Sequence, residues 1–368
     1  MGNTFGMALR VTTFGESHGG GLGAIVDGVP PNLRVDVADL QRALDRRRPG
    51  ATDLGTRRDE PDRVEVLSGL SDGRTLGTPI ALLVRNADGR SGDYEPIRHL
   101  YRPSHADFTT QARYGTPRQP GGGRLSARET VARVAAGEVA RAVLASFAPI
   151  EIVAWVQSLH DLDAMVDAAT VTAVDVDASP VRCPDTAVSA AMAERIRRVR
   201  AEGDTVGGVI RCVARGVPAG LGDPVFDKLE ADLGRALLSI PAAKAFASGA
   251  GFALTRMLGS EANDPFVPGP GGTIVTATNR SGGIQGGISN GMPVDVTVAF
   301  KPVATLAKVQ QTVDDTGRAA EIRGRGRHDP CVLPRAVPIV EAMVALVLAD
   351  HLLRWRGQVG APPSIPGR

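Results

Sequence analysis

The sequence predicts a mixed α/β fold, with strands and helices in both halves of the chain. Short apolar runs bounded by Gly and Pro are typical of strands, and longer segments with apolar residues three or four apart are typical of helices. The 368 residues are 43% hydrophobic and 22% charged, which is ordinary for a globular protein and ample for a sizeable core. This length fits one large domain or two fused domains.

The first half of the chain opens with paired strands and a capped helix. Asp36 is expected to cap a helix that runs to about Arg47, because apolar residues recur on one face. Strands are expected at 9–14, 22–27, 64–67, 79–84 and 150–156.

A long connection and a second helix follow. Residues 87–123 are rich in Gly, Pro, Arg and Asp and too long for an idle connection, so they favour a functional loop region. Ser126 and Glu129 have the spacing of a capping box, which predicts a helix over 127–146.

The second half repeats the mixture of helices and strands. We expect helices at 186–202, 223–238 and 334–355, and strands at 206–217, 273–277 and 292–301. The strand at 292–301 is the clearest, because valines alternate with polar residues. The most apolar segment, "AVPIVEAMVALVLADHLL", is interrupted by Glu341 and Asp350, so it predicts a buried helix rather than a membrane span.

Charge and cysteine content narrow the function classes. A net charge of +2 gives no bulk electrostatic reason to expect nucleic acid or a membrane as a partner. Almost all cationic charge is arginine, which fits a high-GC genome and leaves phosphate binding by individual arginines open. Cys183, Cys212 and Cys331 form no CxxC pair, which indicates a reducing compartment. No secretory signal or transit peptide is visible, so we expect a cytoplasmic protein.

Two glycine clusters suit a ligand. "PGGGRLSARET", residues 120–130, leads a triple glycine into a helix start, where free backbone N–H groups suit a phosphate. A glycine turn before a core helix is the alternative. "NRSGGIQGGISNG", residues 279–291, has too many glycines for a strand. It fits either close approach to a planar ligand such as a flavin or a flexible surface loop.

Three further stretches place histidines and arginines in loops. They are "GESHG" at 15–19, "YRPSHADF" at 101–108 and "RGRGRHDPC" at 323–331, and each of the last two also fits an ordinary solvated loop. The chain has no HExxH, GxSxG or Cys/His metal spacing. Taken together, the clusters favour a polyanionic small molecule that is handled by acid–base chemistry without a metal.

Six motifs in this order resemble the chorismate synthase family. They are "GESHG" at 15–19, "RPSHAD" at 102–107, "GGGRLSARET" at 121–130, "GGIQGGISNG" at 282–291, "KPVAT" at 301–305 and "GRHDPC" at 326–331. The resemblance covers nearly the whole chain. It implies a single domain over 1–368, built as an α/β sandwich with helices packed between antiparallel β-sheets, and a homotetramer.

The resemblance implies a lyase of the shikimate pathway, in aromatic amino-acid biosynthesis. The family converts 5-enolpyruvylshikimate 3-phosphate to chorismate and phosphate by an anti-1,4-elimination. It needs reduced FMN (FMNH2), although the reaction has no net redox change. Some members reduce flavin with NADPH, and a separate flavin reductase is the other source; the sequence leaves both open.

The resemblance also implies the catalytic residues. His18 and His105 match the family's two catalytic histidines, one near the flavin and one near the substrate. An imidazole titrates near neutral pH and can neutralise or protonate a departing phosphate. Asp329 matches the family's acidic residue near the reacting ring, where it would assist proton removal together with the flavin N5.

The binding residues are carried over in the same way. Flavin positions fall on Arg124, Leu125, Ser126, Pro241, Ala242, Gly286, Lys301, Pro302, Val303, Ala304, Thr305 and Arg327. Positions that hold the substrate's phosphate and carboxylates fall on Ser17, Arg47, Arg102, Ser126, Arg128 and Arg327. No metal is implied.

The chain departs from the family pattern at three positions. Asp53 stands where the family usually has an arginine, so we expect it to repel a phosphorylated dicarboxylate and weaken binding. Ala245 and Ala247 stand where Gly and Glu are expected. Two alternatives therefore remain: a diverged flavin-binding paralogue that acts on a related precursor, and an NADPH-flavin reductase with no lyase role.

Overall fold

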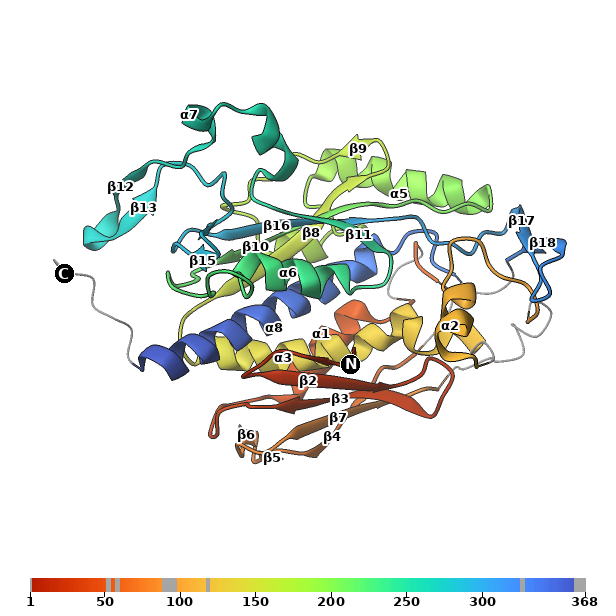
Figure 1. The fold of residues 1–368 in the computed structure, drawn as a ribbon, viewed down its shortest axis with the longest axis horizontal. Coiled ribbons are helices and arrows are strands. Elements are labelled where there is room, and N and C mark those ends of the chain that lie inside the picture. Colours follow the sequence, from red (N-terminus) through yellow and green to blue (C-terminus); the bar gives the residue numbers. More distant parts are fainter. Residues whose placement is uncertain are drawn as a thin grey trace.

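Two five-stranded antiparallel sheets enclose a layer of helices (Figure 1). The computed structural model describes residues 2–50, 54–56, 60–87, 98–116, 120–324 and 328–360. In spatial order, the first sheet holds β1 (Thr4–Phe5), β2 (Arg10–Gly15), β3 (Gly21–Asp27), β7 (Ile80–Arg85) and β4 (Val64–Ser68). The second holds β11 (Ala243–Ser248), β16 (Val294–Phe300), β10 (Gly208–Arg215), β8 (Glu151–Leu159) and β9 (Leu162–Asp163).

The enclosed layer consists of α1 (Val37–Arg47), α3 (Thr130–Ala145) and α8 (Leu333–Val359). α3 packs on β3 of the first sheet and on α8, and α8 packs on β8 and β10 of the second sheet. The apolar faces of both sheets are therefore buried against helices, which is how a layered domain forms its core. The predicted α/β sandwich with helices between antiparallel sheets is confirmed.

Smaller elements surround these layers. The hairpins are β5 (Leu70–Ser71) with β6 (Arg74–Thr75), β12 (Phe266–Pro268) with β13 (Ile274–Thr276), β14 (Ile284–Gln285) with β15 (Ile288–Ser289), and β17 (Val309–Val313) with β18 (Ala319–Arg323). The outer α-helices are α2 (Asp107–Tyr114), α4 (Ala173–Asp177), α5 (Thr186–Ala201), α6 (Leu229–Leu238) and α7 (Gly259–Ala262). Short 3₁₀ helices are η2 (Pro120–Leu125), η3 (Ala127–Glu129), η4 (Gly251–Arg256) and η5 (Pro270–Gly272).

Local signals placed the long helices α1, α3, α5 and α8 and most strands of the two large sheets correctly. Asp36 caps α1 as predicted, because its Oδ1 accepts a hydrogen bond from the N–H of Ala38 at 2.8 Å. The helix predicted over 223–238 starts too early. Val225 has φ +74°, a backbone conformation that no helix residue adopts, and α6 begins only at Leu229.

α8 is long and apolar enough to cross a membrane, but 94% of its most apolar window is buried inside the protein. Its Glu341 is 2% exposed and accepts hydrogen bonds from Arg46 at 2.7 Å, from Arg141 at 3.2 Å and from the N–H of Ala154 at 3.1 Å. The charge is therefore neutralised inside the core, and the expectation of a buried helix is confirmed.

A second buried acid of α8 joins the C-terminal part of the chain to the start of the first sheet. Asp350 Oδ1 accepts hydrogen bonds from the backbone N–H groups of Met7, Ala8 and Leu9 at 3.0, 2.7 and 2.9 Å. One carboxylate oxygen thus satisfies three donors that no strand partner reaches. This contact fixes where β2 begins.

We expect none of the three thiols to react with Ellman's reagent in the native protein at pH 8. Cys183, Cys212 and Cys331 are buried and free, and burial raises the pKa of Cys183 to about 11 and that of Cys331 to about 12. The same reagent in guanidinium chloride should then label three thiols per chain. Fast labelling of any thiol before denaturation would contradict this core packing.

Candidate active site

His18 lies between β2 and β3, in a connection of residues 16–20 that we call the His18 turn. Its Nδ1 is 3.0 Å from Ser17 Oγ. A Cβ on Gly121 would lie 2.1 Å from His18 Cε1, and Gly121 has φ +65°, so glycine alone leaves room for the ring. The backbone N–H of Ser17 also donates to Gly123 O at 3.4 Å. The triple glycine thus does more than precede a helix, because it makes space for an imidazole.

His105 packs against the next residue of the same glycine loop. A Cβ on Gly122 would lie 3.5 Å from His105 Cε1, so the two predicted catalytic histidines lie against consecutive glycines. Ser104, which precedes His105, has φ +55°. A left-handed conformation at a non-glycine residue is a strained one and is common at functional sites. The loop geometry therefore brings together two histidines that are 87 residues apart in the sequence.

We expect Gly121→Ala to lower turnover at least tenfold without loss of the fold. The new Cβ would overlap the His18 ring, and a displacement of about 1 Å can reduce a rate about 10²-fold. Gly73→Ala is the matched control, because Gly73 also has a positive φ but its new Cβ would meet Val35 O only at 3.7 Å. Equal turnover of the two variants would contradict the packing described here.

Asp107, at the start of α2, holds both Arg102 and His105. It accepts from Arg102 Nε at 2.8 Å and from Arg102 Nη2 at 2.7 Å, and its Oδ1 is 3.0 Å from His105 Nδ1. Burial opposes ionisation of Asp107, but hydrogen bonds from Arg102 and His105 outweigh it and hold the pKa of this carboxyl well below its usual range. The Asp107 carboxylate therefore orients the His105 ring beside the glycine loop.

The two most buried arginines of the predicted substrate site share one carboxylate. Asp62 accepts from Arg47 Nη2 at 3.1 Å and from Arg128 Nη1 at 2.6 Å, and the Arg47 and Asp62 side chains are fully buried. Glu60 Oε2 is 3.4 Å from Arg128 Nη2. Burial, partly offset by the charge of Asp62, lowers the pKa of Arg47 to about 9, so this guanidinium stays charged at neutral pH.

This arginine pair keeps unused donors. Among the residues that the structure describes, the buried Arg47 Nε and Arg128 Nη2 make no hydrogen bond, although Arg128 Nη2 forms an ion pair with Glu60 at 3.4 Å. A buried donor without a partner carries a substantial free-energy cost. The pair is therefore suited to an anion that brings its own oxygens.

Asp329 lies close to this pair. Its Oδ1 accepts from the N–H of Thr56 at 2.8 Å, and its Oδ2 pairs with Arg335. Arg335 Nε in turn donates to Arg47 O at 3.4 Å. The structure thus brings the predicted acidic residue next to the predicted anion site. Because each carboxylate oxygen of Asp329 has a partner, the orientation of this side chain is fixed.

A cavity of about 1240 Å³ opens beside His105 and Gly122. Its lining includes Arg124 and the half-exposed Leu125, two predicted flavin residues. Arg124 Nη2 donates to Thr13 Oγ1 at 2.8 Å and thereby ties the cavity wall to β2. A cavity of this size is large enough for a cofactor together with a substrate.

The comparisons with known proteins agree over nearly the full length. A family model described as chorismate synthase matches residues 9–353. The chain belongs to the chorismate synthase family. A chorismate synthase of Synechococcus sp. (strain WH7803) is 58% identical over 358 residues, 97% of this chain and 99% of the relative. One of Rippkaea orientalis is 56% identical over 360 residues, 98% and 99% of the two chains.

A solved structure supports the same assignment. The crystal structure of a chorismate synthase aligns with a TM-score of 0.74 and 31% sequence identity, over 95% of this chain and 93% of that one. Membership of the chorismate synthase family makes the protein an enzyme, a carbon–oxygen lyase of chorismate formation in aromatic amino-acid biosynthesis.

Several other positions predicted from the family motifs to contact a flavin lie around the end of β16. The N–H of Lys301 donates to Ala242 O at 3.0 Å, and Ala242 has φ +71°. Burial and the neighbouring Lys244 lower the pKa of Lys301. Thr305 lines a second cavity of about 350 Å³, to which Asp329 also contributes.

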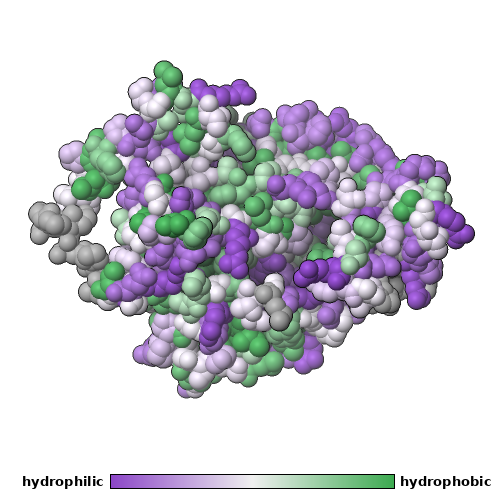
Figure 2. Space-filling model, in the orientation of Figure 1, coloured by the Kyte–Doolittle hydropathy of each residue, from purple (hydrophilic) through white to green (hydrophobic). Residues whose placement is uncertain are grey.

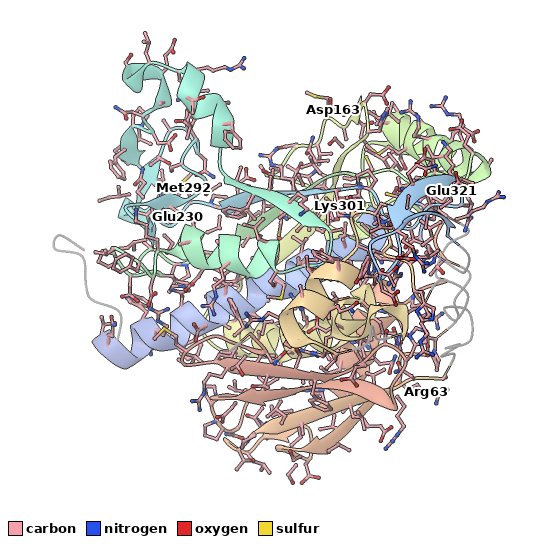
Figure 3. The ribbon with its side chains drawn as sticks, turned by 45° about the vertical axis from the view of Figure 1, so that its right-hand side comes forward. Arg63, Asp163, Glu230, Met292, Lys301 and Glu321 are labelled. Carbon is pink, nitrogen blue, oxygen red and sulfur yellow. The ribbon has the colours of Figure 1, made fainter. Side chains whose placement is uncertain are left out.

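Gly286 does not lie with these residues. It forms the turn between β14 and β15, which precedes β16, whereas Lys301 follows β16. Seven extended residues span about 23 Å, and Figure 3 shows Met292 and Lys301 at opposite ends of this strand. A Cβ on Gly286 would meet no atom of the described residues within 4 Å. A whole strand therefore separates Gly286 from Lys301 within this chain, and the flavin contact expected at each position stays a prediction.

Two positions of the sequence prediction, Arg327 and Asp53, lie outside the described residues. In contrast, several residues of the site were not predicted from sequence: Glu60, Asp62, Asn86 and the role of Asp107. Acidic residues are frequent on protein surfaces, so the residues around Glu60, Asp62 and Asp107 in the sequence do not indicate that these three are part of a site. Only the three-dimensional packing shows that they pair with the predicted arginines.

Proposed function

We propose that the protein converts 5-enolpyruvylshikimate 3-phosphate to chorismate and phosphate by an anti-1,4-elimination, with reduced FMN as cofactor. The observation that carries the proposal is the placement of His18 and His105 against consecutive glycines. The buried Arg128 lies at the helix start that follows these glycines, and the buried Arg47 at the end of α1 shares its partner Asp62. An acid–base pair beside an anion site is what the departure of a phosphate group requires.

The chain's own residues fit the substrate's charges. Arg47 and Arg128 offer buried N–H donors, which suit carboxylate or phosphate oxygens. His18 would protonate or neutralise the departing phosphate. Asp329, held by Thr56 and Arg335, is the acceptor proposed for the ring proton.

The cavity also fits a flavin. Its wall combines Arg124 with apolar surface from Leu125, Met343 and Leu346, a mixture typical of cofactor pockets. Ala242 and Lys301 do not line this cavity and Thr305 lines the second one, so a flavin contact at these positions stays a prediction from the family motifs. When bound, reduced flavin supplies electron density that lowers the barrier to C–O cleavage.

Anaerobic turnover with chemically reduced FMN tests the proposal. Chorismate should appear by absorbance with an equal amount of phosphate, and omission of reduced FMN should abolish both products. Folded protein that binds reduced FMN but releases no phosphate would overturn the proposal and favour a diverged paralogue.

A companion assay with NADPH and oxidised FMN addresses the source of electrons. Product formation would assign flavin reduction to this chain, and its absence would assign that step to a separate flavin reductase. NADPH oxidation without any chorismate under either condition would instead support the reductase alternative.

We further propose that the chain is one domain, that it assembles as a homotetramer, and that it works in the cytoplasm. α7 and the β12–β13 hairpin project from the body, and apolar side chains gather there (Figures 1 and 2). The exposed apolar residues of this arm are Phe252, Leu258, Phe266 and Ile274. An exposed apolar surface of this kind supports contact between copies of this chain. Sedimentation equilibrium, which measures the mass of the assembly, tests this. The three free thiols support a reducing compartment.

A further inference from the structure

Asn86, the residue directly after β7, hydrogen-bonds to both the His18 turn and Arg128. Its side-chain Nδ2 donates to Glu16 O at 2.9 Å and to Gly19 O at 2.7 Å. Its Oδ1 accepts from Arg128 Nε at 2.8 Å. Both amide hydrogens and the amide oxygen are therefore used.

These partners leave a single orientation for the Asn86 amide. Backbone carbonyls can only accept hydrogen bonds, and a guanidinium can only donate them. A rotated amide would place its oxygen against two carbonyl oxygens and its nitrogen against Arg128. The side chain is thus specified by its surroundings rather than free to exchange its two ends.

The hydrogen bonds of Asn86 reach both ends of the His18 turn. The N–H of Gly19 donates to Glu16 O at 3.1 Å and closes the turn. Asn86 bonds to both of these residues, and its backbone N–H donates to Gly20 O at 3.3 Å. In the sequence, His18 lies between the two residues whose carbonyls bond to Asn86. A shift of Asn86 would therefore move the backbone that carries the imidazole.

The other side of Asn86 is also anchored. Glu60 Oε2 accepts from the N–H of Ala87 at 3.0 Å and lies 3.4 Å from Arg128 Nη2. Arg128 is held in turn by Asp62 at 2.6 Å. The segment after β7 therefore connects the His18 turn to the buried arginines through a continuous set of short polar contacts.

We propose that Asn86 is a positioning residue that fixes His18 relative to the anion site at Arg128. The proposal rests on the proposed function, in which this imidazole and this guanidinium act on one substrate. Asn86 itself touches neither reacting atoms nor cofactor in this role. Displacements of about 1 Å in such an arrangement can lower a rate about 10²-fold.

Asn86→Asp and Asn86→Ala test the proposal. Asn86→Asp preserves size and the acceptor for Arg128 but turns an oxygen toward two carbonyls, so kcat should fall about 10- to 100-fold, and its negative charge beside Arg128 should also raise KM. Asn86→Ala also releases Arg128, so its KM should rise as well. Gln157→Ala is the matched control, because Gln157 links Trp155 Nε1 and Ala164 O through the same amide chemistry away from the site.

An NMR readout separates this proposal from the reaction itself. The His18 Hε1 signal, assigned by its loss in His18→Asn, should shift in both Asn86 variants and stay in place in Gln157→Ala. If wild-type protein turns over no substrate, the proposed function fails while the NMR comparison still decides the role of Asn86.

Two outcomes would overturn the role of Asn86. One is a folded Asn86→Asp protein with unchanged kcat and an unchanged His18 signal. The other is a loss of kcat no larger than that of Gln157→Ala, which would make Asn86 a merely structural residue.

Discussion

Replacement of His105 by alanine is expected to lower turnover by about 10²- to 10⁴-fold, the usual contribution of a general acid–base group. The ring packs on Gly122 and lies 3.0 Å from the ionised Asp107, so its loss removes a proton-transferring group from the cavity wall. FMN affinity and the unfolding midpoint should change little, since the side chain lies at the cavity edge and supports no core packing. Steady-state kinetics under anaerobic conditions measure the effect.

His160→Ala provides the control for this substitution. His160 also pairs with an aspartate, but its side chain is 62% exposed in the β8–β9 connection. It should keep the wild-type rate. A His105→Ala enzyme with a rate equal to that of the control would remove His105 from the mechanism.

Asp62→Ala is expected to lower the free energy of unfolding by about 3–5 kcal/mol, because removal of one partner leaves buried charge without compensation. Arg47 and Arg128 both depend on this carboxylate, and the Asp62 side chain is fully buried. Urea unfolding without substrate measures the loss. Added phosphate should stabilise the variant more than the wild type, since an anion can take the place of the missing carboxylate.

Asp27→Ala is the control for a surface pair. Asp27 pairs with Arg10 at 2.6 Å, but both side chains are more than a third exposed, so the change should stay below about 1 kcal/mol. A loss from Asp62→Ala as small as that of Asp27→Ala would contradict the buried network. Equal stabilisation of variant and wild type by phosphate would contradict an anion site at this arginine pair.

The sequence predicted those elements whose cause is local. The cap of α1 at Asp36 and the alternation that marks β16 depend on residues close together in the chain. β11 was not predicted, although it pairs with β16 over its length, because a small-residue stretch gains its strand conformation from its neighbour. The early start expected for α6 failed at Val225, whose left-handed backbone no propensity indicates.

The candidate site shows the same division. Motifs identified the histidines and arginines, because their residue types and neighbours are distinctive. They did not identify the pairing of Arg128 with Asp62, which lies 66 residues away, or the link from Asn86 to the His18 turn. Gly286 shows a second limit of motifs. A motif identifies the position in the sequence, but it does not reveal that the strand β16 separates Gly286 from Lys301.

The hydrogen bonds of Asp350 to residues 7–9 bear on synthesis of the chain at the ribosome. These contacts join groups that are 341 to 343 positions apart, so the residues between β1 and β2 can form them only after nearly the whole chain has been translated. During that interval the residues just before β2 lack this anchor, and exposed strand edges are open to other chains. A nascent chain that stalls before α8 emerges therefore holds every predicted catalytic histidine but lacks the contact that positions the strand before His18.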